Sequence, residues 1–341
     1  MKPPRSMPFL ICFVTFRCNS RCRMCDFWRT GAARAAEELT TDEWLRVIDD
    51  GAALDTWAVS FSGGEPLLRD DLETLIRRAD GHGQTTHVCT NALLLDARRA
   101  RSLAEAGLDS VNVSVDSPDA AVHDAIRGRP TFERVVANLR TFREEAPGVR
   151  LGINSIITRH NYRGAARMVR FAESLGARAL RFGPIHTNLL HHDKDIESFG
   201  DIVLRPDDLP GLRREIARVL RAFEGADLHR NSRPFLRGMD RVTRRQRAHG
   251  CVAGFATACV DPYGGVAPCP DIEGDENVRD RPLTEIWRSK RFQRLRRRVL
   301  RCDRPCWDTT YAELNLRFRM RSTLADPRQF LGELTFYLDK P

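Results

Sequence analysis

Short β-rich runs alternate with helical patterns over the first 184 residues, and this alternation restricts the fold more than any other feature of the chain. The six runs are residues 9–16, 57–62, 85–91, 110–116, 150–157 and 179–183. Helix signals lie between them, such as the capping box from Thr40 to Glu43. Strands separated by helices pair in parallel through right-handed crossovers. The sequence therefore predicts an α/β fold with a partial, open (β/α)6 version of the TIM-like barrel, whose site lies at the carboxyl ends of its strands.

The rest of the chain predicts a helical stretch followed by a small cysteine-rich domain. We expect the barrel at residues 1–200, a helical linker at 201–248 and the C-terminal domain at 249–341. A polar loop after the sixth run is expected to face the barrel mouth, although it could equally be a solvated connection. Its polar residues are His186, Asn188, His191, His192, Asp193 and Asp195.

Composition argues against a membrane or nucleic-acid partner. The longest apolar run, residues 8–16, is about half as long as the roughly 20 residues that a membrane-spanning helix needs. The net charge is +9, but only four of the 55 basic residues are lysines. The densest basic run, residues 288–301, has apolar residues at helical spacing, which predicts an amphipathic helix with a solvated basic face. Ten cysteines grouped at short spacings are typical of metal ligation in a reducing compartment, and we expect a cytoplasmic protein.

Three cysteines directly follow the first predicted strand. Three residues separate Cys18 from Cys22, and two separate Cys22 from Cys25. Three thiolates can hold a 4Fe-4S cluster and leave one iron open to a small molecule. The alternative is a zinc knuckle with a distant fourth ligand.

The cysteine stretch and the segments at the following strand ends resemble the radical S-adenosylmethionine (radical SAM) superfamily. "SGGEP" at residues 62–66 resembles the motif that holds the methionine amino group of SAM, with glycines allowing close backbone approach. Met24 stands where the family usually has an aromatic residue, and Arg127 stands where an arginine often pairs with the methionine carboxylate. The resemblance implies SAM contacts from Met24, Gly63, Gly64, Glu65, Asn91, Ser114, Asp116, Arg127 and Asn154.

A second cysteine group resembles the SPASM/Twitch auxiliary-cluster domains, and the shorter Twitch version fits better. The matching segments are a cysteine-bearing hairpin with Gly264 and Gly265 at its turn, the stretch "PLTEIW" and a closing "CDRPCW". The resemblance implies a second, auxiliary 4Fe-4S cluster with four cysteine ligands, and a structural zinc is the alternative. The expected ligands are Cys251, Cys269, Cys302 and Cys306. The closing pair has three intervening residues where relatives often have two.

The resemblance also implies the chemistry. An external electron donor such as flavodoxin or ferredoxin reduces the first cluster, SAM is cleaved, and a 5'-deoxyadenosyl radical abstracts hydrogen from an unactivated C–H bond. Only about eight residues precede the first strand, which leaves no room for a peptide-binding domain and favours a small-molecule substrate such as a sugar or aminocyclitol. The leading prediction is oxidation of a carbinol to a ketone, with the auxiliary cluster accepting the second electron and His186 as base.

Three other functions stay open on the sequence. An epimerase would need a thiol to return hydrogen to carbon, and Cys89 and Cys259 are the candidates, whereas Cys12 is expected to be a core residue. Modification of a ribosomal peptide is the second alternative. A cluster-bearing structural or regulatory protein is the third.

Overall fold

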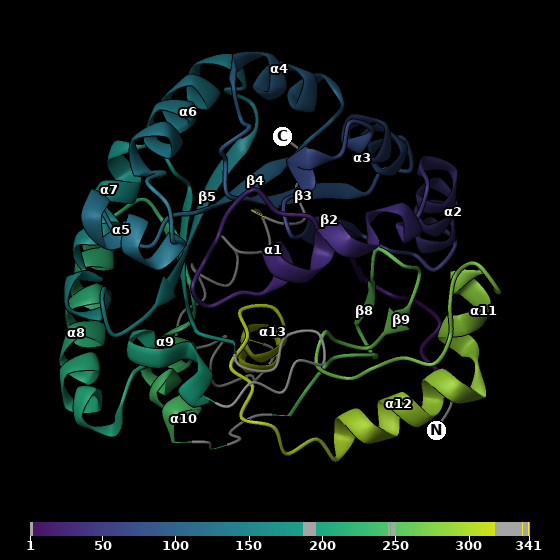
Figure 1. Cartoon of the computed structure of the whole chain (residues 1–341). Coiled ribbons are helices and arrows are strands. Elements are labelled where there is room, and N and C mark those ends of the chain that lie inside the picture. The colour runs from purple at the N-terminus through teal and green to yellow at the C-terminus, as the bar shows by residue number, and fades with distance from the viewer. Residues whose placement is uncertain are drawn as a thin grey trace.

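The computed structural model describes residues 3–186, 196–244, 246, 250–317, 336 and 340. Its strands form one curved sheet in the order β7-β6-β5-β4-β3-β2-β1-β8-β9 (Figure 1). The outermost strands are β7 (His229–Arg230) at one edge and β8 (Thr257–Val260) with β9 (Val266–Ala267) at the other. The six predicted strands are confirmed as β1 (Phe9–Thr15), β2 (Ala58–Gly63), β3 (Thr85–Thr90), β4 (Ser110–Ser114), β5 (Arg150–Ile157) and β6 (Ala179–Pro184). Each pairs in parallel with the next along the chain. The predicted open barrel is therefore confirmed.

Helices cover the outer face of this sheet, and α13 (Tyr311–Arg317) lies on its inner side (Figure 1). The outer helices are α2 (Thr41–Ala52), α3 (Leu72–Gly81), α4 (Ala97–Glu105), α6 (Phe132–Glu145), α7 (Arg167–Ser174) and α8 (Leu209–Ala222). Helix α5 (Ala120–Arg127) instead contacts the loop that follows β1. The capping box predicted at Thr40 is present, since the Thr40 side chain accepts from the Glu43 amide and the Glu43 carboxylate accepts from the Thr40 amide. None of the helices in the described residues combines the length and apolar character that crossing a bilayer requires.

The two faces of the sheet differ in polarity. Leu10 points toward α2, where a Cβ on Gly51 would lie 3.1 Å from it, and Cys12 on the same face is fully buried in the core as expected. Residues in register across strands share a face. The opposite, inner face is strongly polar, because it carries Ser60, Ser62, His87, Cys89, Asn112, Ser114, Asn154 and Arg181. The C-terminal ends of the strands therefore surround a polar interior.

The stretch expected to be a linker continues the barrel. Helix α8 buries Leu212, Ile216 and Val219, and strand β7 (His229–Arg230) pairs in parallel with β6. Two short helices follow, α9 (Arg233–Gly238) and α10 (Asp240–Thr243). The apolar face of α8 explains why this segment packs against the barrel and does not form a solvated linker between two domains. The division into three domains stays a prediction.

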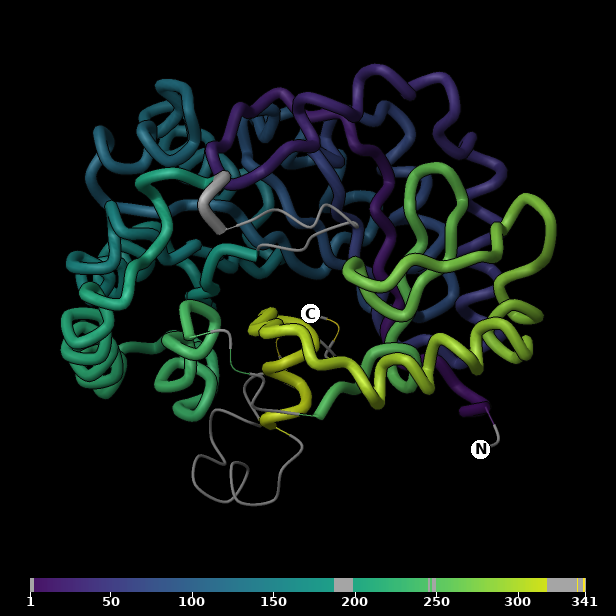
Figure 2. Tube along the Cα trace, turned by 60° about the horizontal axis from the view of Figure 1, so that its bottom comes forward, coloured from purple at the N-terminus to yellow at the C-terminus, as the bar shows by residue number. Residues whose placement is uncertain are grey.

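The C-terminal segment adds to the same sheet. Strand β8 (Thr257–Val260) pairs in parallel with β1, and β9 (Val266–Ala267) returns antiparallel to β8. The predicted turn is confirmed, with Gly264 at φ +90°. Then come α11 (Leu283–Arg288), α12 (Lys290–Leu300) and α13 (Tyr311–Arg317), and α8 and α12 lie at opposite flanks of the molecule (Figure 2). Phe292, Leu295 and Val299 of α12 are buried as its amphipathic pattern predicts, whereas Leu300, the last residue, is 54% exposed.

Candidate active site

The loop with Cys18, Cys22 and Cys25 follows β1 and leads into α1 (Phe27–Thr30). The Arg23 amide donates to the Ile126 carbonyl of α5 at 3.1 Å. Gly128 ends α5 at φ +72°, and a Cβ there would lie 2.2 Å from the Arg21 carbonyl oxygen. Only glycine allows this approach, so the end of α5 fixes the loop that carries the three thiols.

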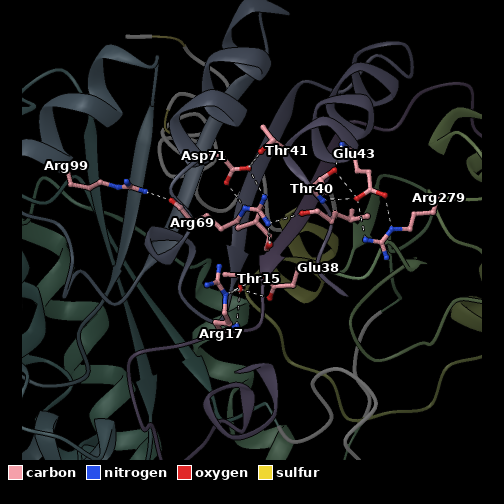
Figure 3. Close-up of polar contacts among 12 residues, drawn as sticks. Thr15, Arg17, Glu38, Thr40, Thr41, Glu43, Arg69, Asp71, Arg99 and Arg279 are labelled. Carbon is pink, nitrogen blue, oxygen red and sulfur yellow. Dashed lines mark hydrogen bonds and ion pairs between the residues drawn. The ribbon is translucent and has the colours of Figure 1, made fainter. Parts of the chain in front are cut away.

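A network of polar side chains holds the start of the same loop (Figure 3). Glu38 accepts hydrogen bonds from the Thr15 hydroxyl at 2.6 Å and from the Phe16 amide at 3.0 Å. Buried Arg69 donates to the carbonyl oxygens of Val14 and Leu39 and pairs with both carboxylate oxygens of Asp71. These bonds hold the segment after α1 against the end of β1.

Arg69→Ala is expected to lower the free energy of unfolding by about 3 kcal/mol, because it leaves the partly buried Asp71 carboxylate without its cation and removes the side-chain donor to the carbonyl oxygens of Val14 and Leu39. Urea unfolding of anaerobic protein measures the change. Arg78→Ala is the matched control, since Arg78 makes the same two-bond contact with Asp49 but is exposed at the surface. Equal midpoints for the two variants would contradict this role of Arg69.

The "GGE" motif lies at the end of β2, and the backbone of the segment after β1 packs directly against its two glycines. Cβ atoms on Gly63 and Gly64 would lie 2.1 and 2.2 Å from the carbonyl oxygens of Thr15 and Arg17. The close backbone approach that the glycines allow is thus to the cysteine loop. Glu65 is fully buried and accepts from the Leu67 amide, the Thr90 hydroxyl and the Asn91 amide at 2.6 to 3.0 Å. Burial raises the pKa of Glu65, and these bonds oppose the rise.

Arg127 lies beside the cysteine loop and is already paired. Its Nε is 2.6 Å from Asp116 Oδ2, and its Nη1 is 3.7 Å from the Cys22 Sγ. The other Asp116 oxygen accepts from the Ile156 amide at 2.8 Å. Burial opposes the charge on Arg127, but Asp116 and Cys22 outweigh it and raise the pKa. Contacts of Arg127 and Asp116 with SAM stay predictions, and both side chains also hold α5, β4 and β5 together.

The remaining predicted SAM contacts lie in the cysteine loop, on β4 and β5, and directly after β3. Asn91 Nδ2 donates to Asn19 Oδ1 at 2.7 Å and lies 4.0 Å from the Cys18 Sγ. Met24 packs against a small apolar cluster that includes Ile185. Ser114 and Asn154 are in register on the inner face.

The donor set fits the implied cofactors. Within the described residues, the Asn154 Oδ1 is buried without a hydrogen-bond partner, which suits a ligand that donates a hydrogen bond to it. Three cysteines in one loop beside an open polar interior suit a cluster with one accessible iron. Burial raises the pKa of the Cys18 thiol to about 12, so iron must displace its proton on binding.

The two predicted hydrogen donors both face the inner side. Cys89 is hydrogen-bonded to Ser60 and Ser62, and burial raises its pKa to about 11. The Cys259 Sγ lies 2.9 Å from the Tyr311 hydroxyl of α13, and burial raises its pKa to about 12. Both thiols are therefore protonated near neutral pH, as hydrogen-atom donors must be; their role stays a prediction.

The expected auxiliary ligands lie in different surroundings. Burial, and then the charges of Asp271, Cys259 and Cys251, raise the pKa of the Cys269 thiol. Cys306 instead lies with His186 and Asp271, and the ligand atoms of this trio are all within 4.8 Å of one another. Cys302 lines a cavity with several arginines of α12.

His186 is the one residue of the predicted polar loop within the described part of the chain; Asn188, His191, His192, Asp193 and Asp195 lie outside it. Its Nε2 is 3.0 Å from Asp271 Oδ2. Burial opposes a charge on His186, but Asp271 and Cys306 raise its pKa. The base role of His186 stays a prediction.

Sequence reasoning missed Asp271, His87 and Arg181. His87 Nδ1 lies 2.5 Å from the Ser110 hydroxyl, and Arg181 donates to Asn112 at 3.4 Å. A histidine and an arginine within otherwise buried strand runs were the available signals, because burial of a charged group requires partners. Asp271 gave only the weak signal of lying two residues after Cys269.

Comparisons with known proteins agree with both cysteine groups. The family model of the radical SAM superfamily matches residues 12–172, and that of SPASM, an iron-sulfur cluster-binding domain, matches residues 251–308. The AdoMet-dependent heme synthase of Oleidesulfovibrio alaskensis is 29% identical over 87% of this chain and 79% of its own length. The PqqA peptide cyclase of Methylocella silvestris is 30% identical over 82% of this chain and 73% of its own length.

Solved structures share the fold. Streptococcus suis SuiB bound to S-adenosylmethionine matches with a TM-score of 0.67 at 20% identity, covering 85% of this chain and 68% of SuiB. In its ligand-free structure the matched part is 66% of SuiB, so the chain spans about two thirds of that protein. Native anSMEcpe with bound AdoMet matches with a TM-score of 0.63 at 18% identity, covering 85% of this chain and 82% of the other.

These matches decide between iron-sulfur clusters and zinc. The matched C-terminal domain is an iron-sulfur cluster-binding domain and the N-terminal match is to the radical SAM superfamily, so zinc is rejected at both cysteine groups. The cofactors are 4Fe-4S clusters and SAM. Membership of this enzyme family also replaces the purely structural or regulatory alternative. The chain belongs to the radical SAM superfamily and carries a C-terminal iron-sulfur cluster-binding domain of the SPASM type.

Proposed function

We propose that this radical SAM enzyme modifies a peptide substrate at a C–H bond. Relatives that cover most of the chain include PqqA peptide cyclases, at 29 and 30% identity. They favour the peptide alternative over the sugar or aminocyclitol that the sequence suggested. The shortness of the segment before β1 does not argue against a peptide substrate, because a peptide can also bind directly in the opening of the barrel.

A cavity beside the cysteine loop carries the proposal. It has a volume of about 410 Å³ and lies between residues of the loop region, such as Phe16 and Phe27, and residues of the hairpin, such as Ala267 and Pro270. Phe16 stacks on Phe27 with ring centroids 4.7 Å apart, and Tyr263 meets Phe16 edge-on at 5.6 Å. Aromatic walls of this kind suit an apolar or aromatic side chain of a peptide.

Charged groups at the same cavity can orient the peptide backbone. Arg34 lies over the Tyr263 ring at 3.7 Å, and Asp261 and Glu273 also line the cavity. SAM at the three-cysteine cluster supplies a carbon radical that removes hydrogen from an unactivated C–H bond. The task of the chain is to place one C–H bond near the cofactor and to exclude water.

A substrate panel tests the proposal. Reduced protein with SAM is incubated with synthetic peptides that each carry one aromatic residue and, separately, with sugars and aminocyclitols. We expect a peptide product lighter by two hydrogen atoms, with one 5'-deoxyadenosine released per turnover. Ala267→Trp should fill the cavity and stop peptide turnover, whereas the exposed Ala217→Trp on α8 should not. Turnover of sugars but of none of the peptides would contradict the proposal.

Oxidation of a small carbinol is the second candidate, and the polar inner face favours it. Ser60, His87 and Asn154 offer hydrogen-bonding groups that a hydroxylated substrate needs. Turnover in deuterated water separates this outcome from epimerisation. A ketone without carbon-bound deuterium indicates oxidation, whereas an isobaric product with one deuterium, lost in Cys89→Ala or Cys259→Ala, indicates an epimerase. The external electron donor stays a prediction.

A further inference from the structure

Apart from the three-cysteine loop, the group formed by His186, Asp271 and Cys306 is the one place in the described residues where three ligand-type side chains converge. One nitrogen, one oxygen and one sulfur atom lie within 4.8 Å of one another. His186 follows β6, Asp271 follows the hairpin, and Cys306 belongs to the closing cysteine pair. Three distant parts of the sequence therefore meet at one point beside the barrel opening.

One of the two carboxylate oxygens of the buried Asp271 has no hydrogen-bond partner within the described residues. The residue is 6% exposed, and its Oδ2 lies 3.0 Å from His186 Nε2. Its Oδ1 is buried without a hydrogen-bond partner in the described part of the chain. A buried carboxylate oxygen without a donor costs free energy comparable to a lost charged hydrogen bond. A metal ion removes that cost by accepting the lone pair.

The position of Asp271 suits the auxiliary cluster. It lies in the short turn that begins at Cys269, where the Ile272 amide donates to the Cys269 carbonyl at 3.3 Å, and its carboxylate is within 4.8 Å of the Cys306 Sγ. Asp271 is thus a shared neighbour of two of the expected cluster ligands.

Cys302 lies in a different environment. It lines a separate cavity of about 610 Å³, together with Ile272 and basic residues. Those basic residues are Arg294, Arg297, Arg298, Arg301 and Arg304. Neither Asp271 nor Cys306 lines this cavity.

We propose that Asp271 ligates the auxiliary 4Fe-4S cluster through Oδ1, together with Cys251, Cys269 and Cys306, and that Cys302 is not a ligand. Carboxylates ligate iron in other proteins, and non-cysteine ligands also occur on iron-sulfur clusters. His186 is a positioning residue, since its contact with Oδ2 turns the other oxygen toward the cluster. This assignment is independent of the nature of the substrate.

Four variants of the anaerobically reconstituted full chain test the assignment. The measurements are iron and acid-labile sulfide content, the electron paramagnetic resonance (EPR) signals of the reduced protein and the midpoint potential of the auxiliary cluster. Cys302→Ser should keep about eight irons, whereas Asp271→Asn should keep about four. Asp271→Cys should restore about eight irons, with a changed auxiliary EPR signal and a lower midpoint potential, because thiolate donates more charge than carboxylate. The control is Asp275→Asn, an exposed neighbour that should behave as wild type.

The EPR signal of the three-cysteine cluster reports folding in each variant. If Asp271→Asn loses this signal too, the other two variants decide. Retained iron in Cys302→Ser with a shifted auxiliary signal in Asp271→Cys supports the assignment. Loss of four irons in Cys302→Ser, or a wild-type auxiliary signal in both Asp271 variants, overturns it.

Discussion

Replacing Cys18, Cys22 and Cys25 together by alanine is expected to lower the iron content from about eight to about four per chain and to abolish SAM cleavage. The three thiols share one loop held by α5 and by the Arg69 network, so removing them leaves the first cluster without protein ligands. Iron and acid-labile sulfide analysis measures the loss, and release of 5'-deoxyadenosine measures cleavage.

The matched control for this triple variant is Cys12→Ala. Cys12 is a fully buried thiol of β1 that points away from the inner face, so iron content should stay at about eight. Stoichiometric zinc without acid-labile sulfide in anaerobically isolated protein would contradict the assignment of two iron-sulfur clusters.

Arg127→Ala is expected to lower the free energy of unfolding by about 3–5 kcal/mol, because it leaves the Asp116 carboxylate buried without its cation. Asp116 is 1% exposed, and its Oδ2 lies 2.6 Å from the Arg127 Nε. Urea unfolding of anaerobic protein gives the change in stability. Adding Asp116→Asn should recover part of the loss, since the amide oxygen can still accept from the Ile156 amide and carries no charge.

The same variant separates two roles of Arg127. A contact with the methionine carboxylate predicts weaker SAM binding by folded Arg127→Ala protein, with both clusters retained. The exposed Arg134→Ala on α6 should change neither stability nor SAM affinity. If Arg127→Ala binds SAM as tightly as wild type but unfolds more easily, the arginine serves the Asp116 pair alone.

Local sequence signals determined most of the architecture. The six strands, the capping box at Thr40 and the hairpin turn at Gly264 each depend on residues close together in the chain, so periodicity and turn chemistry were enough to predict them. The cysteine triad is also local, because one short loop carries all three thiols.

Only the tertiary structure decided which partners the buried polar groups have. Glu65 reaches Thr90 and Asn91 on the neighbouring strand, and Arg127 reaches Asp116, although the sequence alone suggested that SAM is their partner. The pairing of β8 with β1 joins segments about 250 residues apart, which no local pattern reports. Asp271 gains its importance only from the approach of His186, 85 residues away. Such contacts form because a buried charge or an open strand edge must be satisfied, and the partner that satisfies it is fixed by the folded geometry and not by sequence spacing.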